Sequence, residues 1–176
     1  MSNTSIGEAF IAQSRALLTD EYRIKLRKSV AALPADALWW RANATSNSVG
    51  NLLLHLAGNI RQHIVSGIGE TPDVRDRTTE FGADGGADAV ELMGRLDDVL
   101  DQADAILARL RPEDLERERT VAGARRTVLE IIYTTVQHAA LHLGQIIMIA
   151  KERTPGSVRF YEDTPKGGKA IWRDAR

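Results

Sequence analysis

The sequence predicts an all-α fold in which four long helices pack as a four-helix bundle. Four stretches repeat apolar residues with the helical period of about 3.6 residues, and two of them begin with capping-box spacing. The 176 residues, 43% of them apolar, suffice for one domain with a full core. We therefore expect a single domain over residues 1–176, with a core at about 5–152 and a tail at 153–176.

The first predicted helix spans about residues 5–32, and the second spans about residues 48–66. Ser5 and Glu8 have the spacing of a capping box, which marks the start of the first helix. Pro34 cannot continue a helix and restricts the residue before it, so the first helix should end just ahead of it.

The third predicted helix spans about residues 88–110, and the fourth spans about residues 127–152. Thr127 and Glu130 form a second capping-box pair. The stretch Ile131–Ala150 contains no Asp, Glu, Lys or Arg, yet its Thr, Gln and His side chains would be costly in lipid. We therefore predict a buried helix here and no membrane partner.

The connections predict irregular structure. Gly67–Ala87 is unusually long for a loop inside a compact domain. It could let the second and third helices run parallel, as in some four-helix bundles, or it could form a mobile lid. Glu116–Arg126 is typical of a turn or short hairpin around Gly123, and the tail from Thr154 has too many helix breakers for another long helix.

Three histidines are the strongest functional signal. His138 and His142 are four residues apart, so their imidazoles share one face of the fourth helix, among apolar residues that should face inward. His55 lies mid-helix on a polar stripe of the second helix whose members fall within about 40° of one another. That stripe contains no charged residue, unlike most exposed helix surfaces; its members are Ser48, Asn51, His55, Asn59 and Gln62.

These histidines could be hydrogen-bonded core residues or the ligands of one metal ion. An HxxxH spacing arises by chance, but three unsatisfied imidazoles in an apolar bundle would cost stability. Zinc, nickel, iron(II), cobalt and copper all accept neutral imidazole, and three protein ligands leave a position for water or substrate. His63 lies about 80° around the helix from His55 and is predicted at a surface or interface, outside the site.

Two segments of the chain resemble the signature stretches of the DinB-like (damage-inducible B) superfamily. They are NSVGNLLLHLAGN (47–59) and HAALHLGQIIMIA (138–150), and the more specific part is the HxxxHxGQI pattern. That pattern is formed here by His138, His142, Gly144, Gln145 and Ile146. Together with the Trp39–Trp40 pair, the resemblance covers about residues 5–152, and the tail is weakly matched.

The resemblance implies a four-helix bundle of up-down-down-up type that is commonly dimeric. It also implies one divalent transition metal, such as zinc, nickel or iron, held by His55, His138 and His142. Characterised relatives include transferases and isomerases that use low-molecular-weight thiols such as mycothiol or bacillithiol. A metal-dependent S-transferase is therefore the favoured function. The alternatives are a metal-dependent hydrolase or isomerase without thiol, and a non-enzymatic dimer braced by its metal.

Four further polar residues are candidates to orient a metal ligand or a small-molecule substrate, or simply to bond between helices. They are Asn51 and Asn59, one turn on either side of His55, and Thr134 and Gln145 on the fourth helix. Trp40 is most simply a packing residue, with the wall of a substrate pocket as the alternative. The sequence alone does not identify the catalytic residues.

Composition limits the remaining function classes. The net charge of −1, from 23 basic and 24 acidic residues, gives no general attraction to nucleic acid or anionic membranes. The absence of cysteine excludes disulfides and thiolate ligands, and it fits a cytoplasmic location.

Overall fold

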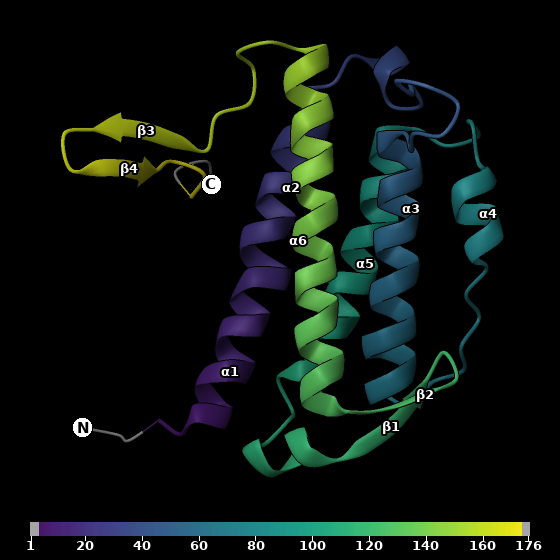
Figure 1. Ribbon diagram of the computed structural model, residues 1–176, viewed down its shortest axis with the longest axis vertical. Helices are drawn as coiled ribbons and strands as arrows, with labels where there is room; N and C mark the ends of the chain where they lie inside the picture. The colour runs from purple at the N-terminus through teal and green to yellow at the C-terminus, as the bar shows by residue number, and fades with distance from the viewer. Residues whose placement is uncertain (1–3, 174–176) are drawn as a thin grey trace.

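The structure, a computed structural model that describes residues 4–173, is mainly helical. Four long helical segments account for most of it (Figure 1), and π-helical stretches continue the first two. In chain order the segments are α1 (Ile6–Arg15) continuing through η1 (Ala16–Glu21) into α2 (Tyr22–Ala31), α3 (Val49–Ile60) continuing into η3 (Arg61–Ile68), α5 (Ala89–Leu107) and α6 (Val128–Arg153). The short helices are η2 (Ala35–Ala37), α4 (Arg77–Gly82) and η4 (Pro112–Glu116).

Helix starts lie where the capping residues predict them. Ser5 and Glu8 form the predicted capping box of α1, and Thr127 and Glu130 form that of α6. Each box satisfies backbone N–H groups that the first turn of a helix leaves without a partner. Within residues 4–173, no helix is long and apolar enough to cross a bilayer.

Two antiparallel hairpins correct the all-α prediction. β1 (Glu118–Val121) pairs with β2 (Ala124–Thr127), which confirms the hairpin expected around Gly123, and β3 (Tyr161–Thr164) pairs with β4 (Gly167–Ala170) in the tail. Ala122 and Gly123 both have positive φ, 51° and 79°, as the two-residue turn between twisted strands requires. All residues of β3 and β4 are exposed, so the sequence lacks the alternation of apolar and polar residues that would predict these strands.

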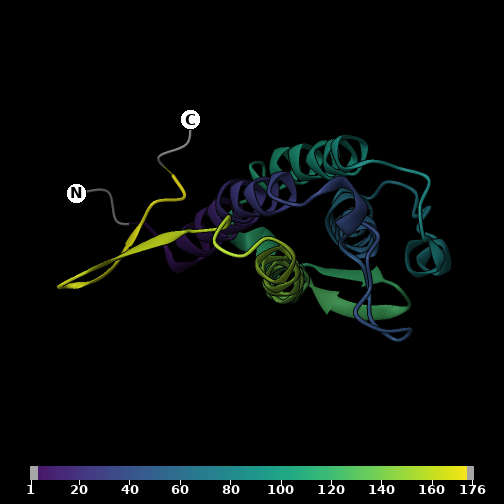
Figure 2. The same ribbon diagram turned by 90° about the horizontal axis from the view of Figure 1, so that it is seen from above.

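The long segments are arranged so that α3 and α5 run in one direction while α1–α2 and α6 run in the other (Figure 1). α3 packs on α5 and α6, and α2 packs on α6. The connection between α3 and α5 returns along the outer side of α3 and carries α4 there (Figure 2). The long connection thus allows two successive helices to run parallel, as one of the two predicted alternatives required.

The core lies between these four segments. Its largest fully buried side chains are leucines and isoleucines from all of them: Leu18, Leu52, Leu53, Leu56, Ile60, Ile64, Leu92, Leu96, Leu100, Leu107, Ile131 and Ile132. Val158, Phe160 and Trp172 of the tail form a second buried cluster with Ala150. The tail therefore packs on the end of α6, although its hairpin projects away from the helices (Figure 2).

Candidate metal centre

Three imidazole rings from two helices meet between α3 and α6. The Nε2 atom of His138 lies 3.0 Å from Nε2 of His55 and 3.1 Å from Nε2 of His142. A suitable nitrogen from each ring lies within 4.8 Å of the other two. The three predicted histidines are therefore brought together, His138 and His142 by their shared face on α6 and His55 from the middle of α3.

The spacing of the three nitrogens fits a tetrahedrally coordinated ion. Two ligands about 2.05 Å from such an ion lie about 3.3 Å apart, close to the two nitrogen–nitrogen distances here. If the Nε2 atom of His138 carries no proton, three Nε2 lone pairs converge and no hydrogen bond joins the rings. The residues present fit a divalent transition ion with three imidazole ligands and a further position for another group.

Hydrogen bonds on the outer sides of two rings fix their tautomers. Nδ1 of His55 lies 2.9 Å from Oε2 of Glu80, and Nδ1 of His142 lies 2.7 Å from Oε1 of Gln145. Both oxygens accept only, so each Nδ1 carries the proton and each Nε2 presents a lone pair inward. Of the two roles open for Gln145, the contact observed is with the histidine cluster. Arg75 Nη2 also lies 3.0 Å from Nδ1 of His55, but a protonated Nδ1 cannot accept from it.

A buried ion pair stands behind His55. The guanidinium of Arg75 makes two parallel hydrogen bonds of 2.8 Å to the carboxylate of Glu80, and its Nη1 donates to Oε1 of Gln62 at 2.9 Å. The side chains of Arg75 and Glu80 are only 7% and 8% exposed. Glu80 thus bridges an arginine and a histidine, an arrangement that orients the ring and increases its basicity as a ligand.

Sequence reasoning missed Arg75 and Glu80, because both lie in the long connection and outside any apolar repeat. One signal in the sequence could have predicted the short helix α4. The Asp76 side chain caps this helix by accepting from the Thr79 backbone N–H at 3.1 Å, and aspartate is a common residue at the start of helices. Asn51 holds this helix in place through bonds from its side-chain amide to the carbonyl oxygens of Glu80 and Ala83. Asn51 therefore anchors the segment and makes no hydrogen bond to the three histidines.

Glycine at position 58 makes room for Glu80. A Cβ at Gly58 would lie 1.9 Å from Oε1 of Glu80, whose carboxylate is held by Arg75 and His55. We expect Gly58→Ala to displace Glu80 and to lower both the metal affinity and the melting temperature. Gly94→Ala is the matched control, because that helical position has open space and alanine there should stabilise by about 0.5–1 kcal/mol. Equal melting temperatures for the two variants would contradict this account.

His63 lies closer to the site than predicted. It is half-buried, its Nδ1 is fully buried, and it lines a small pocket together with His138. The prediction of a surface position assumed a regular α-helix, whereas η3 is π-helical from Arg61 onward. The wider π turn uses more residues per revolution, so it turns His63 back toward the face of Asn59 and His55. His63 still lies outside the three-histidine cluster.

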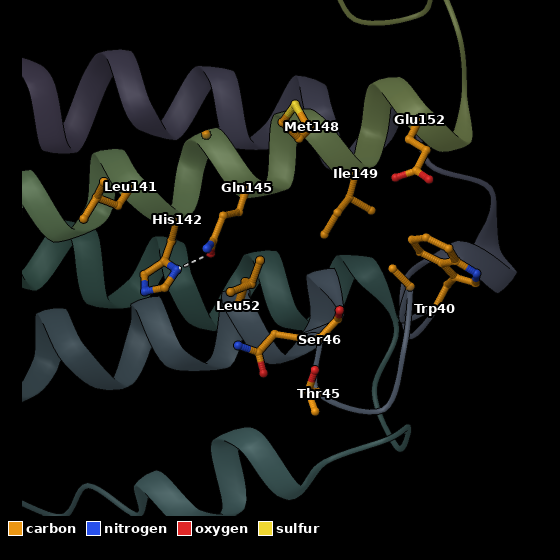
Figure 3. Close-up of a pocket in the computed structure, with 13 residues that line it drawn as sticks. Trp40, Thr45, Ser46, Leu52, Leu141, His142, Gln145, Met148, Ile149 and Glu152 are labelled. Atoms are coloured by element: carbon orange, nitrogen blue, oxygen red, sulfur yellow. Dashed lines mark hydrogen bonds between the residues drawn. The ribbon is translucent and has the colours of Figure 1, made fainter.

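A large, mostly apolar pocket opens beside His142 and Gln145. Its volume is about 830 Å³, and Figure 3 shows both side chains pointing into it from α6, opposite Leu52. Trp40 lies at its far end, so this residue does contribute a wall. The other lining residues are Ala42, Thr45, Ser46, Asn47, Leu141, Gly144, Met148, Ile149 and Glu152.

A second, polar pocket of about 220 Å³ lies on the His138 side of the cluster. Asn59 and Thr134, the two remaining candidates, both line it. Thr134 donates its hydroxyl proton to the Glu130 carbonyl at 2.7 Å, and within residues 4–173 Asn59 makes no side-chain hydrogen bond. The other lining residues are His63, Arg126, Thr135, Gln137 and His138.

Burial favours the neutral form of His55, His63 and His138. It is the main cause that lowers the pKa values of His55 and His63, and it lowers the pKa of His138 from 6.5 to about 4, with help from the neighbouring His142 and His55. The bond to Glu80 opposes this effect at His55. Neutral imidazole is the form that binds metal, so the lowered pKa values favour the binding form of His55 and His138 at neutral pH.

The metal-free protein should lose stability on acidification. Because the pKa of His138 falls from 6.5 to about 4 on folding, only the unfolded chain takes up this proton between those pH values. We expect the free energy of unfolding to decrease as pH falls from about 6.5 to about 4. Urea unfolding with chelator present checks this, with His138→Gln as the control. Identical pH slopes for the variant and the wild type would contradict the assignment.

The fold and the site together define a mainly helical protein with three histidines converging between two helices. The chain belongs to the DinB-like superfamily: residues 5–159 match the family model described as "Protein of unknown function (DUF1572)". No curated protein matches the chain. Among solved structures, a DinB-like protein, YjoA of Bacillus subtilis, is similar with a TM-score of 0.64 and 18% identity, over 84% of this chain and 96% of that one. At this identity the likeness concerns the fold.

Proposed function

We propose that the protein is a divalent-metal-dependent enzyme that transfers a group to or from a low-molecular-weight thiol. The observation that supports this is the apolar pocket of about 830 Å³ that opens beside the three histidines. A site that only braces helices needs no such space, whereas a catalytic site keeps a coordination position open next to a cavity.

The contacts of each residue indicate its role in the proposed reaction. When bound, a divalent ion lowers the pKa of a coordinated thiol or water and so provides a nucleophilic anion near neutral pH. His55, His138 and His142 would hold the ion, with Glu80 and Gln145 fixing the tautomers of His55 and His142. Leu52 and Ile149 on the pocket wall would exclude water from the bound thiol and its acceptor.

Two alternatives keep a physical basis. A metal-dependent hydrolase or isomerase without thiol would use the same three histidines, with water in the open position. A non-enzymatic dimer whose metal braces the helices is favoured by the direct link that an ion would make between α3 and α6. This last case predicts a large decrease in melting temperature on metal removal, because metal binding would then contribute directly to folding.

Turnover by metal-loaded protein tests the proposal. Protein purified without a histidine tag is loaded with zinc, nickel or iron(II) and incubated with mycothiol, bacillithiol or cysteine and a panel of electrophiles. The proposal expects loss of free thiol that depends on both protein and metal. Electrophile consumption without thiol loss would favour the hydrolase or isomerase. No turnover, together with a melting temperature that collapses on chelation, would favour the bracing role.

We also propose that the protein acts as a homodimer. Large apolar side chains on α6 are exposed along one broad face of the helix: Leu129, Tyr133, Leu141 and Met148. Leu141 and Met148 also form the open wall of the apolar pocket, so a second copy packed on this face would enclose the bound ligand.

Substitutions away from the pocket test the dimer. We expect light scattering to give twice the chain mass of 19.4 kDa for the wild type and a single chain mass for Leu129→Glu/Tyr133→Glu. Val90→Glu is the control, because Val90 is 81% exposed on α5 and should leave the dimer intact. A monomeric wild type, or dissociation by the control alone, would refute this interface.

The same proposal includes the architecture and the location. We assign the four long segments to a four-helix bundle of up-down-down-up type; the parallel course of α3 and α5 and the packing of α2 on α6 support this. A cytoplasmic location stays a prediction from the absence of cysteine.

A further inference from the structure

We propose that the small polar pocket on the His138 side is a subsite for the carboxylate group of the substrate. This inference rests on the proposed metal site, and it does not depend on the use of a thiol. It adds a substrate class to the proposed function: a molecule whose carboxylate lies in the polar pocket and whose apolar part lies in the larger one.

Three buried polar atoms around this pocket lack a partner within the described residues. They are Oδ1 of Asn59, Nδ1 of His63 and Nδ1 of His138. Asn59 is only 8% exposed and lines the pocket directly. Buried polar groups are nearly always hydrogen-bonded, and leaving one unpaired is costly. Three such atoms at one cavity of about 220 Å³ indicate that a polar group occupies it in the working protein.

The charge of the pocket indicates an anion. Arg126 is half-buried and, within residues 4–173, forms no ion pair, while no Asp or Glu lines the pocket. Arg75 lies near enough to lower the pKa of His63, as Arg126 does, but its own charge is balanced by Glu80. Arg126 also lies near enough to Glu130 to add to the lowering of the pKa of that carboxyl, which comes mainly from hydrogen bonds to Thr127, but Glu130 does not line the pocket. A single guanidinium at the pocket matches a group with one negative charge, which favours a carboxylate over a phosphate.

The donors also suit a carboxylate. If Nε2 of His138 holds the metal, its Nδ1 carries a proton and donates. Rotation of the Asn59 amide by 180° would put its NH2 group where the unpaired Oδ1 now lies. The guanidinium of Arg126 supplies further N–H donors, so a carboxylate can then accept from all three side chains. Occupation of the pocket would thereby give His138 the outer hydrogen-bond partner that Glu80 gives His55 and Gln145 gives His142.

The two pockets lie on either side of the histidine cluster along α6. Thr134, Gln137 and His138 line the polar pocket, whereas Leu141, His142 and Gln145 line the apolar one. A ligand long enough to reach both pockets would lie across the histidine cluster with its middle part. This places the reacting centre of the substrate between its carboxylate and its apolar part.

Binding of hexanoate tests the subsite without any measurement of activity. Isothermal titration calorimetry compares hexanoate with its neutral analogue hexanamide on zinc-loaded wild type, Arg126→Gln and Arg125→Gln. Arg125 is the matched control: it is adjacent on the same strand, but its side chain is 75% exposed and pairs with Glu118. We expect Arg126→Gln to weaken hexanoate binding at least about tenfold and to leave hexanamide binding unchanged. Arg125→Gln should bind hexanoate like the wild type.

The remaining outcomes separate the subsite from the metal site. Hexanoate binding that is insensitive to Arg126→Gln, or no tighter than hexanamide binding, would overturn the subsite. Preferential binding of inorganic phosphate would overturn the carboxylate assignment. Elemental analysis of the same samples measures the metal content independently of hexanoate binding. Hexanoate binding that depends on Arg126 in a protein unable to retain metal would support the subsite and refute the metal site. Thermal unfolding of each variant verifies that it is folded.

Discussion

Replacing His55 by alanine is expected to abolish retention of a divalent metal ion in a protein that still folds. The wild type should retain about one transition metal ion per chain, because the three Nε2 atoms converge at ligand spacing. His55→Ala removes the only one of the three ligands that α3 supplies, and the pair on α6 alone cannot hold a tetrahedral ion tightly. Elemental analysis of protein purified without a histidine tag measures the metal content, and His138→Ala should behave alike.

His63→Ala is the matched control for this experiment. His63 lies on the same helical segment, eight residues further on, and is half-buried, but it does not join the cluster. The control should retain metal at wild-type stoichiometry. If His55→Ala kept its metal, or if the wild type took up none on titration, the three histidines would be packing residues and the proposed function would fail with them.

Glu80→Gln is expected to have the second largest effect, and to act on both metal affinity and stability. Glutamine keeps one acceptor oxygen where the carboxylate has two, so Arg75 and His55 compete for it, and weakening of such an outer contact typically lowers metal affinity 10–100-fold. The substitution also leaves Arg75 buried without its counter-charge, which typically costs about 3–5 kcal/mol of unfolding free energy. Competition with a metal-binding dye measures the affinity, and urea unfolding with chelator present measures the stability of the metal-free protein.

Glu91→Gln serves as the control, because Glu91 pairs with Arg95 on the surface of α5, where both side chains are about half exposed. Exposed pairs of this kind contribute at most about 1 kcal/mol, and no metal effect is expected. The double variant Glu80→Leu/Arg75→Met should regain stability without regaining metal affinity, since it removes the unpaired charge and the His55 acceptor together. Full metal affinity in Glu80→Gln would show that the ion pair serves packing alone.

The sequence predicts the long helices and the histidine cluster well, because both depend on local rules. Capping pairs such as Thr127 and Glu130 fix where helices begin, and the four-residue spacing of His138 and His142 fixes their common face. The apolar character of that face then places both rings against α3. These features follow from helical geometry and require no knowledge of how distant segments meet.

The surroundings of the cluster could not be predicted in the same way. Glu80 reaches His55 from 25 residues away, through a six-residue helix inside a connection without apolar periodicity. His63 lies outside the cluster as predicted, but its half-burial was not foreseen, because a change from α- to π-helical geometry leaves no mark in residue spacing. The β3–β4 hairpin was missed because its strands are exposed on both faces. In each case tertiary contacts or solvent exposure override the periodic pattern on which sequence reasoning depends.

The position of the histidines along the chain bears on when the site can form during synthesis. His55 and His138 are 83 residues apart, and α6 is the last of the long helices to leave the ribosome. A nascent chain that ends before α6 holds a single member of the cluster and cannot chelate an ion. Once α6 docks, an ion shared between these two helices closes a loop of that length, and its binding energy opposes their separation. Only chains that include α6 would then carry metal. A chelator would weaken the docking of α6 and leave the earlier folding steps unchanged.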